Sequence, residues 1–425
     1  MSPIRKLWNL AWNSPALRQS GVAMVGTVLT GGFMAVAMIL ASRFLGPIDF
    51  GIFSVAIAIM MIVTKGTDLG LNQLFPRLLN QWHTKPEFQE NFIAQMVQAR
   101  LVLSVITLSA GVLSIPWIMR WLDFPYGSLL VVAVIGAVLI GWYEHGYLLL
   151  SAAHKFMSVA TMSVLQALLK LVVFAGLFFS GYGTLFLISL IYFVSPFISL
   201  LIVMQWTRFA WVRKFVPVQK SVRKAIVRFW PHAAVGSVAI TLINNMDLLF
   251  VQGTLNSLET GLYAGASRLA SFVVLATYAV SSVLNNRVSR YRSKKDLRAY
   301  LWKSLSLAGL AFLGFLVFVP LSRTLIIWTI GPEYLGGLLP FIILVANALL
   351  GFALVPYTSY FFAVDAPSYH SVGGVLQVSL IVLGNILFLP AYGLLAAATI
   401  RFVTTLVFGV YTLGMILLTW RKAGV

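Results

Sequence analysis

Long apolar runs separated by short polar breaks extend along almost the whole chain. A helix that crosses a membrane needs about 20 mainly apolar residues. About twelve runs meet this requirement, and they are 21–42, 51–75, 95–118, 127–150, 158–180, 184–206, 231–252, 261–285, 303–329, 337–363, 370–389 and 393–419. Because lipid cannot satisfy the hydrogen bonds of an open backbone, these runs predict a bundle of helices.

A basic hydrophilic break at 207–230 divides the runs into two sets of six. We therefore predict an all-α, polytopic membrane protein of about 12 transmembrane helices in two six-helix bundles. Its expected parts are an N-terminal lobe at 1–206 with an interfacial N-terminal segment, a cytoplasmic linker at 207–230, and a C-terminal lobe at 231–425. An even number of helices in each half makes the halves parallel repeats.

A turn between two apolar runs occurs twice, at 45–53 and again 210 residues later at 255–263. The matched positions are Asp49 with Glu259, Gly51 with Gly261, and Phe53 with Tyr263. Arg77 and Arg287 match at the same spacing. Several matches in one register indicate a duplicated architecture.

The composition supports a membrane protein and restricts its chemistry. Hydrophobic residues make up 60% of the chain and charged residues 10%, whereas a soluble domain has about 25% charged residues. The absence of cysteine excludes disulfides, thiolate metal sites and a cysteine nucleophile. The scattered histidines show no metal-site spacing, and we find no catalytic constellation, so neither an enzyme nor a cofactor is expected.

The net charge of +19 is concentrated in particular loops between the apolar runs. This placement argues against nucleic acid as a partner and predicts that both termini are cytoplasmic. The predicted external turns contain only three basic residues, Arg43, Arg120 and Arg323. The basic linker is expected to contact anionic membrane lipids.

Eight ionisable residues lie within the apolar runs, namely Lys65, Asp68, Arg100, Glu144, Lys170, Asp247, Arg268 and Arg401. Each costs roughly 2.5–3.5 kcal/mol at mid-membrane on insertion scales. One interpretation is structural ion pairs, such as Lys65 with Asp68 on one helix, or Asp247 with Arg268 on consecutive helices. The other is a water-filled cavity between the two halves.

Five of these residues are basic and three are acidic, so they cannot all neutralise one another. We therefore predict a cationic substrate cavity formed by Lys65, Arg100, Lys170, Arg268 and Arg401. An excess of positive charge at this depth suits an anionic group such as a phosphate or pyrophosphate.

The remaining polar residues form a second candidate set, which contains Asp68, Glu144, Asn244, Asn245 and Asp247. A carboxylate with amide neighbours can bind Na⁺ or titrate, so the set is a candidate coupling site for Na⁺ or H⁺. The alternative is a hydrogen-bonded cluster that joins helices.

Several short motifs, taken in order, resemble those of the polysaccharide-transporter (Wzx-like) oligosaccharide flippases of the multidrug/oligosaccharidyl-lipid/polysaccharide exporter superfamily. In the first half they are Arg43-Phe44-Leu45-Gly46-Pro47 with Phe50-Gly51, then Thr67-Asp68-Leu69-Gly70-Leu71, and Arg77. In the second half they are Asp247-Leu248-Leu249, Gly261-Leu262-Tyr263, Arg268-Leu269 and Gly331-Pro332-Glu333-Tyr334. The resemblance extends over nearly the whole chain.

This resemblance implies MATE-like V-shaped lobes that work by alternating access in a bacterial or archaeal cytoplasmic membrane. The implied substrate is an undecaprenyl-pyrophosphate-linked oligosaccharide, moved by an ion gradient, and other polysaccharide-assembly proteins are candidate partners. Two alternatives remain. A MATE-like drug/cation antiporter would be expected to have an acidic cavity, and a membrane-embedded glycan polymerase or ligase would need a larger external loop.

Overall fold

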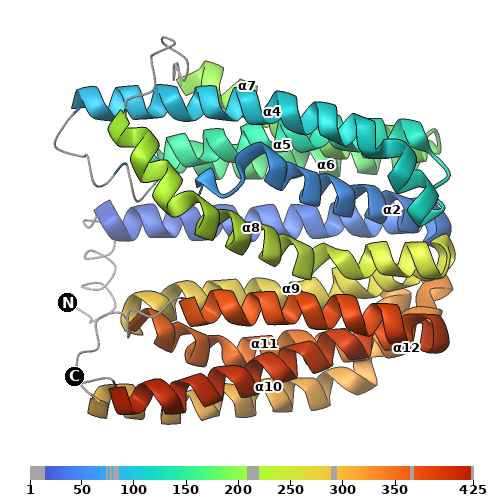
Figure 1. The fold of residues 1–425 in the computed structure, drawn as a ribbon. Helices are drawn as coiled ribbons and strands as arrows, with labels where there is room; N and C mark the ends of the chain where they lie inside the picture. The colour runs from blue at the N-terminus through green and yellow to red at the C-terminus, as the bar shows by residue number, and fades with distance from the viewer. Residues whose placement is uncertain are drawn as a thin grey trace, which may run out of the picture. The chain divides into compact units, whose positions relative to one another are not determined.

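The computed structural model describes residues 15–72, 75, 79, 86–207, 220–288, 294–363 and 368–422. The predicted N-terminal interfacial segment up to residue 14, Arg77, and linker residues 208–219 lie outside these ranges. The helices are α2 (Pro15–Asp68), α4 (Pro86–Leu122), α5 (Gly127–Ala152), α6 (Phe156–Ser180), α7 (Leu185–Thr207), α8 (Lys220–Thr254), α9 (Ser257–Val288), α10 (Lys294–Thr329), the short 3₁₀ helix η1 (Pro332–Gly337), α11 (Leu338–Ala363) and α12 (Ser368–Lys422) (Figure 1). The described residues contain no strand, which confirms the all-α prediction.

Nine stretches of the described residues are long and apolar enough to cross a membrane. Two of them, Gly21–Asp68 and Val372–Thr419, are 48 residues long, about twice what one crossing needs. Each is interrupted at a glycine, Gly46 in α2 and Gly393 in α12. These interruptions fall in or beside the predicted breaks between runs. Helix α9 is not among the nine, and the exact count of twelve stays a prediction.

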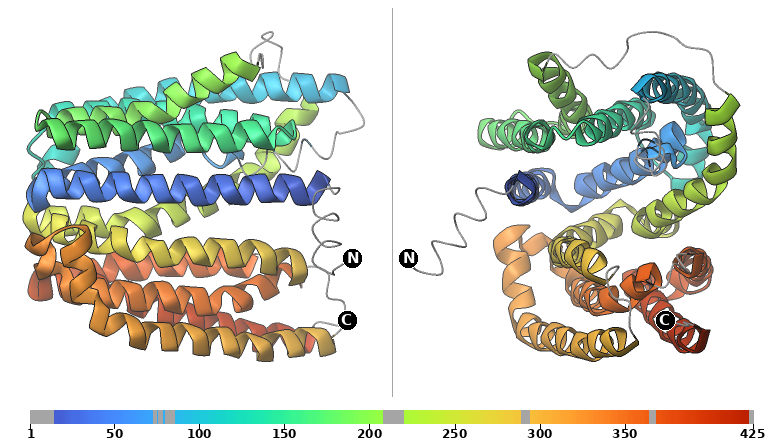
Figure 2. Two further views of the ribbon diagram at one scale, coloured as in Figure 1. Left: turned by 180° about the vertical axis from the view of Figure 1, so that it is seen from behind. Right: turned by 90° about the vertical axis from the view of Figure 1, so that its left-hand side faces the viewer.

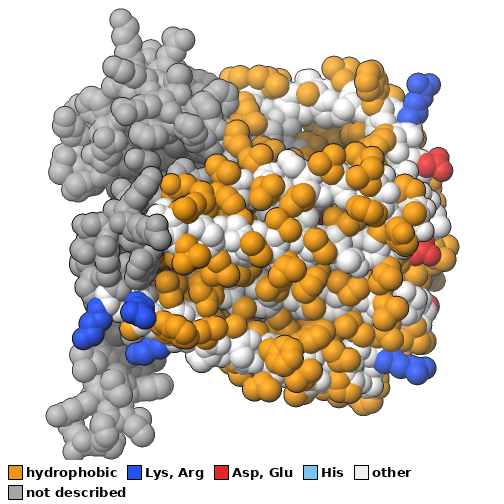
Figure 3. All heavy atoms as spheres, turned by 60° about the horizontal axis from the view of Figure 1, so that its bottom comes forward, with side chains coloured by type: hydrophobic (Ala, Val, Ile, Leu, Met, Phe, Trp, Pro, Cys, Tyr) orange, Lys and Arg blue, Asp and Glu red, His pale blue; other side chains and the backbone are white. Residues whose placement is uncertain are grey.

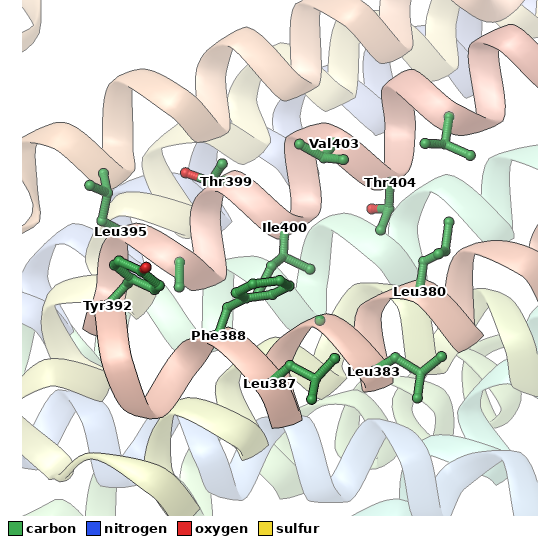
Figure 4. A pocket seen from close by; sticks show the side chains of 13 residues that line it. Leu380, Leu383, Leu387, Phe388, Tyr392, Leu395, Thr399, Ile400, Val403 and Thr404 are labelled. Atoms are coloured by element: carbon green, nitrogen blue, oxygen red, sulfur yellow. The ribbon is translucent and has the colours of Figure 1, made fainter.

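The interruption at Gly393 makes α12 a hairpin with two antiparallel arms. A Cβ atom on Gly384 in the first arm would lie 2.9 Å from Ile400 in the second arm. Nearer the open end, the Tyr411 hydroxyl donates to the Tyr369 carbonyl at 3.1 Å. Gly393 has φ 59° and ψ −148°, a conformation that is essentially restricted to glycine. This one residue therefore permits the reversal that Figure 4 shows between Phe388 and Leu395.

Many of the exposed side chains of the described residues are apolar. On the face shown in Figure 3, hydrophobic side chains cover most of the described area, and the coloured charged side chains lie mainly at its two edges. Large apolar side chains such as Trp117, Phe179 and Trp328 are 81%, 82% and 79% exposed. Water would oppose so much apolar exposure, whereas lipid does not. The protein is a multi-pass membrane protein.

The chain forms two compact units. Unit 1 contains residues 1–44, 59–119 and 125–238, and unit 2 contains residues 45–58, 120–124 and 239–425. In unit 1, α7 packs against both α5 and α6, and in unit 2, α11 packs against α9, α10 and α12 (Figure 2). Half of the predicted lobe boundary at 207–230, residues 208–219, lies outside the described residues, and the boundary stays a prediction.

The two repeated turns contact each other inside unit 2. A Cβ atom on Gly51 would clash with the Ser257 carbonyl, and one on Gly261 would clash with the Pro47 carbonyl. Both glycines are therefore required by close backbone approach. The paired acids Asp49 and Glu259 are only half-buried near this contact.

Candidate functional site

One polar cluster in unit 1 lies where α2, α4 and α5 meet. The Lys65 Nζ on α2 is 3.5 Å from the Glu144 carboxylate on α5. Asn72 donates its amide hydrogen to the same carboxylate at 3.1 Å. The side chains of Lys65 and Glu144 are 22% and 31% exposed, so this ion pair is partly accessible.

Arg100 on α4 is the most deeply buried member of this cluster, with 1% exposure. Its guanidinium donates to the Asn72 side-chain oxygen at 2.6 Å and to the Gly141 carbonyl. The carboxylates of Asp68 and Glu144 act on it electrostatically. A buried guanidinium requires such compensation, because removing a charge from water is costly unless it is hydrogen-bonded and paired.

Asp68 does not form the suggested ion pair with Lys65. Helix α2 ends at Asp68, and its carboxylate accepts a hydrogen bond of 2.5 Å from the Gly70 amide. Leu69 and Gly70 have φ values of 42° and 84°, so the chain turns sharply here. The carboxylate therefore caps this turn, and Lys65 pairs with Glu144 from another helix instead.

Lys170 lies near the middle of α6 and is 2% exposed. Its ammonium donates to Gln166, one turn earlier, at 3.0 Å and lies 4.1 Å from the centre of the Tyr192 ring on α7. Within the described part of the chain, no carboxylate forms an ion pair with it. Lys170 is thus a buried basic side chain whose contacts are an amide oxygen and an aromatic face.

A second polar cluster, in unit 2, is centred on Arg401 of α12. Its guanidinium forms an ion pair with Asp247 of α8 at 2.6 Å and donates to the Asn244 side-chain oxygen at 3.1 Å. It also donates to the Ile243 carbonyl. From α9, the Tyr263 hydroxyl donates to the same Asp247 oxygen at 3.2 Å.

Two other predicted residues lie apart from these Arg401 contacts. Asn245 donates to the Thr241 carbonyl of its own helix at 2.8 Å. Arg268 is half-buried on α9, and no ion pair involves it among the residues that the structure describes. The suggested pair of Asp247 with Arg268 is not observed, because α9 presents Tyr263 to Asp247. Arg268, five residues further along, lies on another side of the helix.

The structure thus divides the five predicted cations into two groups. Lys65, Arg100 and Arg401 have carboxylates beside them. Lys170 and Arg268 have no ion-pair partner within the described ranges. The three intramembrane acids therefore lie beside three of the basic residues, and Lys170 and Arg268 are left without a paired carboxylate among the described residues.

Several residues that hold these clusters are absent from the sequence-based candidates. Asn72 bridges Arg100 and Glu144, Tyr263 contacts Asp247, and Tyr192 covers Lys170. Gly141 lets α2 approach α5, since a Cβ atom there would clash with Thr67. Tyr263 is matched in the repeat, but its hydrogen bond has no sequence signal.

A separate apolar groove lies between the arms of α12 (Figure 4). It encloses about 580 Å³, and its lining includes Leu383, Phe388, Leu395 and Val403. None of the residues that line it is charged. This groove therefore offers no counter-charge to an anionic group.

The sequence matches the profile of the family described as "Polysaccharide biosynthesis protein" over residues 16–284. The chain belongs to this family. The match covers the unit 1 cluster, Lys170, the Asn244–Asp247 segment and Arg268, but it ends before Arg401. The family expected from the sequence motifs is confirmed.

The fold of this protein is similar to those of several membrane transporters with solved structures. A lipid II flippase, MurJ, in an inward closed conformation has a TM-score of 0.77 at 13% identity, covering 93% of this chain and 87% of MurJ. An inward-facing multidrug resistance MATE transporter of the MOP superfamily has a TM-score of 0.68 at 13% identity, covering 97% of this chain and all of the transporter (100%). A point mutant of the Vibrio cholerae MATE transporter VcmN has a TM-score of 0.54 at 12% identity, with coverages of 94% and 98%. No curated protein matches the sequence significantly.

Proposed function

We propose that this protein is a flippase that moves an undecaprenyl-pyrophosphate-linked oligosaccharide, such as an O-antigen, capsule or exopolysaccharide repeat unit, across the cytoplasmic membrane by alternating access. The single observation that carries the proposal is that two basic side chains, the buried Lys170 and the half-buried Arg268, have no ion-pair partner among the described residues. Membership of a polysaccharide biosynthesis family and the fold of MurJ support it.

An uncompensated cation within a membrane is costly, so its presence favours a role in binding an anion. A pyrophosphate group offers several oxygen acceptors and a matching negative charge. In contrast, Lys65, Arg100 and Arg401 already have carboxylates beside them. We therefore assign headgroup binding first to Arg268, which is half-buried, and second to Lys170.

Lys170 is covered in this conformation, so the proposal requires that its environment open during the transport cycle. An ion gradient, of Na⁺ or H⁺, is the proposed energy source. Asp247 is a poorer Na⁺ ligand than its sequence suggests, since Arg401 already neutralises it. A drug/cation antiporter with the same fold would be expected to have acidic residues in its cavity, not two basic residues without an ion-pair partner.

Export of surface polysaccharide in cells lacking this protein tests the assignment. Lys170→Ala and Arg268→Ala should each reduce export at least about tenfold, the equivalent of ~1.4 kcal/mol, with unchanged membrane levels. Arg323→Ala is the matched control, because it removes one positive charge from an exposed position of α10. Full export by both test variants would show that neither Lys170 nor Arg268 is needed to bind the headgroup.

The proposed orientation, with both termini in the cytoplasm, can be tested by single-cysteine labelling because the natural chain contains no cysteine. Tyr182→Cys lies in an exposed turn that we expect outside, and Ala153→Cys lies in one that we expect inside. A membrane-impermeant maleimide should label only Tyr182→Cys in intact cells and both variants after permeabilisation. The opposite pattern would reverse the orientation.

A further inference from the structure

Three contacts of the Arg401 guanidinium are with oxygen acceptors on one side of α8. They are the Ile243 backbone carbonyl, the Asn244 side-chain carbonyl and the Asp247 carboxylate. One guanidinium from α12 contacts all three. The set therefore combines a full negative charge with two neutral oxygens around a single cation.

A backbone carbonyl, an amide oxygen and a carboxylate are also the ligands that a hard monovalent or divalent metal cation uses in proteins. The Asp247 oxygen that Arg401 does not contact adds to this resemblance. It is buried and has no hydrogen-bond partner among the described residues. Without the guanidinium, α8 would present these three oxygens to the position that the guanidinium fills, with the second Asp247 oxygen on the same carboxylate.

We propose that Arg401 is a tethered cation that occupies, within this protein, a site whose oxygens would otherwise bind free Na⁺. The guanidinium is covalently attached to α12, so it neutralises Asp247 without exchanging with solution. Free Na⁺ can enter only when the Arg401 guanidinium is absent from the site.

This inference deepens the proposed function, because it excludes direct Na⁺ coupling at this cluster. It rests on the proposed function only for that consequence in transport. A Na⁺ gradient cannot act through Asp247 while Arg401 is seated there. Any coupling at this cluster must then come from protonation of the carboxylate or from movement of Arg401. The ion-binding claim itself concerns only Arg401 and its oxygen partners.

Thermal melting of the purified full-length protein in lipid nanodiscs tests the claim without a transport assay. NaCl is compared with KCl and choline chloride at equal ionic strength, which separates specific binding from screening. The wild-type melting temperature should be the same in all three salts. Arg401→Ala and the better space-filling Arg401→Gln should melt at least roughly 3 °C higher in NaCl than in choline chloride, because a ligand that binds only the folded state stabilises it.

Two control variants define the site. Arg401→Lys keeps a tethered positive charge and should remain insensitive to Na⁺. Arg401→Ala combined with Asp247→Asn removes the carboxylate and should lose the Na⁺ effect. Free guanidinium at low concentration should stabilise Arg401→Ala but not the wild type.

A Na⁺-specific stabilisation of the wild type that Asp247→Asn abolishes would overturn the proposal. It would equally be overturned if folded Arg401→Ala and Arg401→Gln responded to neither Na⁺ nor guanidinium. Because the readout is melting and not flipping, these failures would leave the proposed substrate untouched.

Discussion

Arg100 and Lys170 show two ways of burying a cation in the same unit. Arg100 is held by Asn72, the Gly141 carbonyl and two nearby carboxylates. Lys170 is held by the Gln166 side chain and the face of the Tyr192 ring. A desolvated cation–π contact contributes about 2 kcal/mol and a hydrogen bond to a charged group about 1.5–3 kcal/mol. These gains roughly offset an insertion cost of about 2.5–3.5 kcal/mol for Lys170.

The two cations should therefore differ in their effect on stability. Arg100→Met leaves the buried Asp68 carboxylate without this nearby positive charge and the acceptors on Asn72 and Gly141 without their donor, and it should lower the free energy of unfolding by about 3–5 kcal/mol. Lys170→Met removes both the contacts and the insertion cost that they offset, and it leaves no carboxylate without its ion-pair partner, so it should change the free energy of unfolding by less than about 1 kcal/mol. Denaturant titration in mixed micelles measures both. A large loss with Lys170→Met would mean that the lysine is structural, and the functional assignment would weaken.

The sequence identified the intramembrane charges because each is expensive in lipid, but it did not identify their partners. Lys65 and Glu144 are 79 positions apart, and Arg401 and Asp247 are 154 positions apart. Lys65 and Asp68 are close in sequence but do not form the suggested pair, because helix α2 ends at Asp68 and its carboxylate binds the Gly70 amide instead. Such pairings depend on which helices pack together, which apolar patterning does not specify.

At the scale of elements, the apolar pattern predicted the helices well, and even the breaks in the two longest. The predicted gap between 21–42 and 51–75 contains Gly46, and that between 370–389 and 393–419 adjoins Gly393. The repeat also predicted that Gly51 and Gly261 are equivalent. It did not predict that the two turns touch, because a sequence repeat shows that two segments are similar and does not show whether they are in contact.

The glycine contact gives a prediction about packing within unit 2. Gly261→Ala directs a methyl group into the Pro47 backbone carbonyl, which cannot rotate away, and should cost about 1–3 kcal/mol of unfolding free energy. Gly414→Ala is the control, because a Cβ atom there has no neighbour within 4 Å. The control should be neutral or up to about 1 kcal/mol more stable. Equal melting temperatures for the two variants would contradict the packing described.

For the whole molecule, the fold does not identify the substrate. At 13% identity the chain keeps the fold of both a lipid II flippase and a multidrug transporter. Apolar length and helix packing suffice to specify this fold, and they carry no information about cargo. The case for a phosphorylated lipid comes instead from family membership and from the two cations that lack an ion-pair partner among the described residues.

The most direct test is leaflet exchange in liposomes that contain the purified protein and a lipid-linked oligosaccharide with a pyrophosphate group. A matched lipid that lacks phosphate serves as the control substrate. The account predicts fast exchange of the pyrophosphate lipid only, reduced at least about tenfold by Arg268→Ala. Equal exchange of both lipids, or exchange that Arg268→Ala and Lys170→Ala leave unchanged, would contradict it.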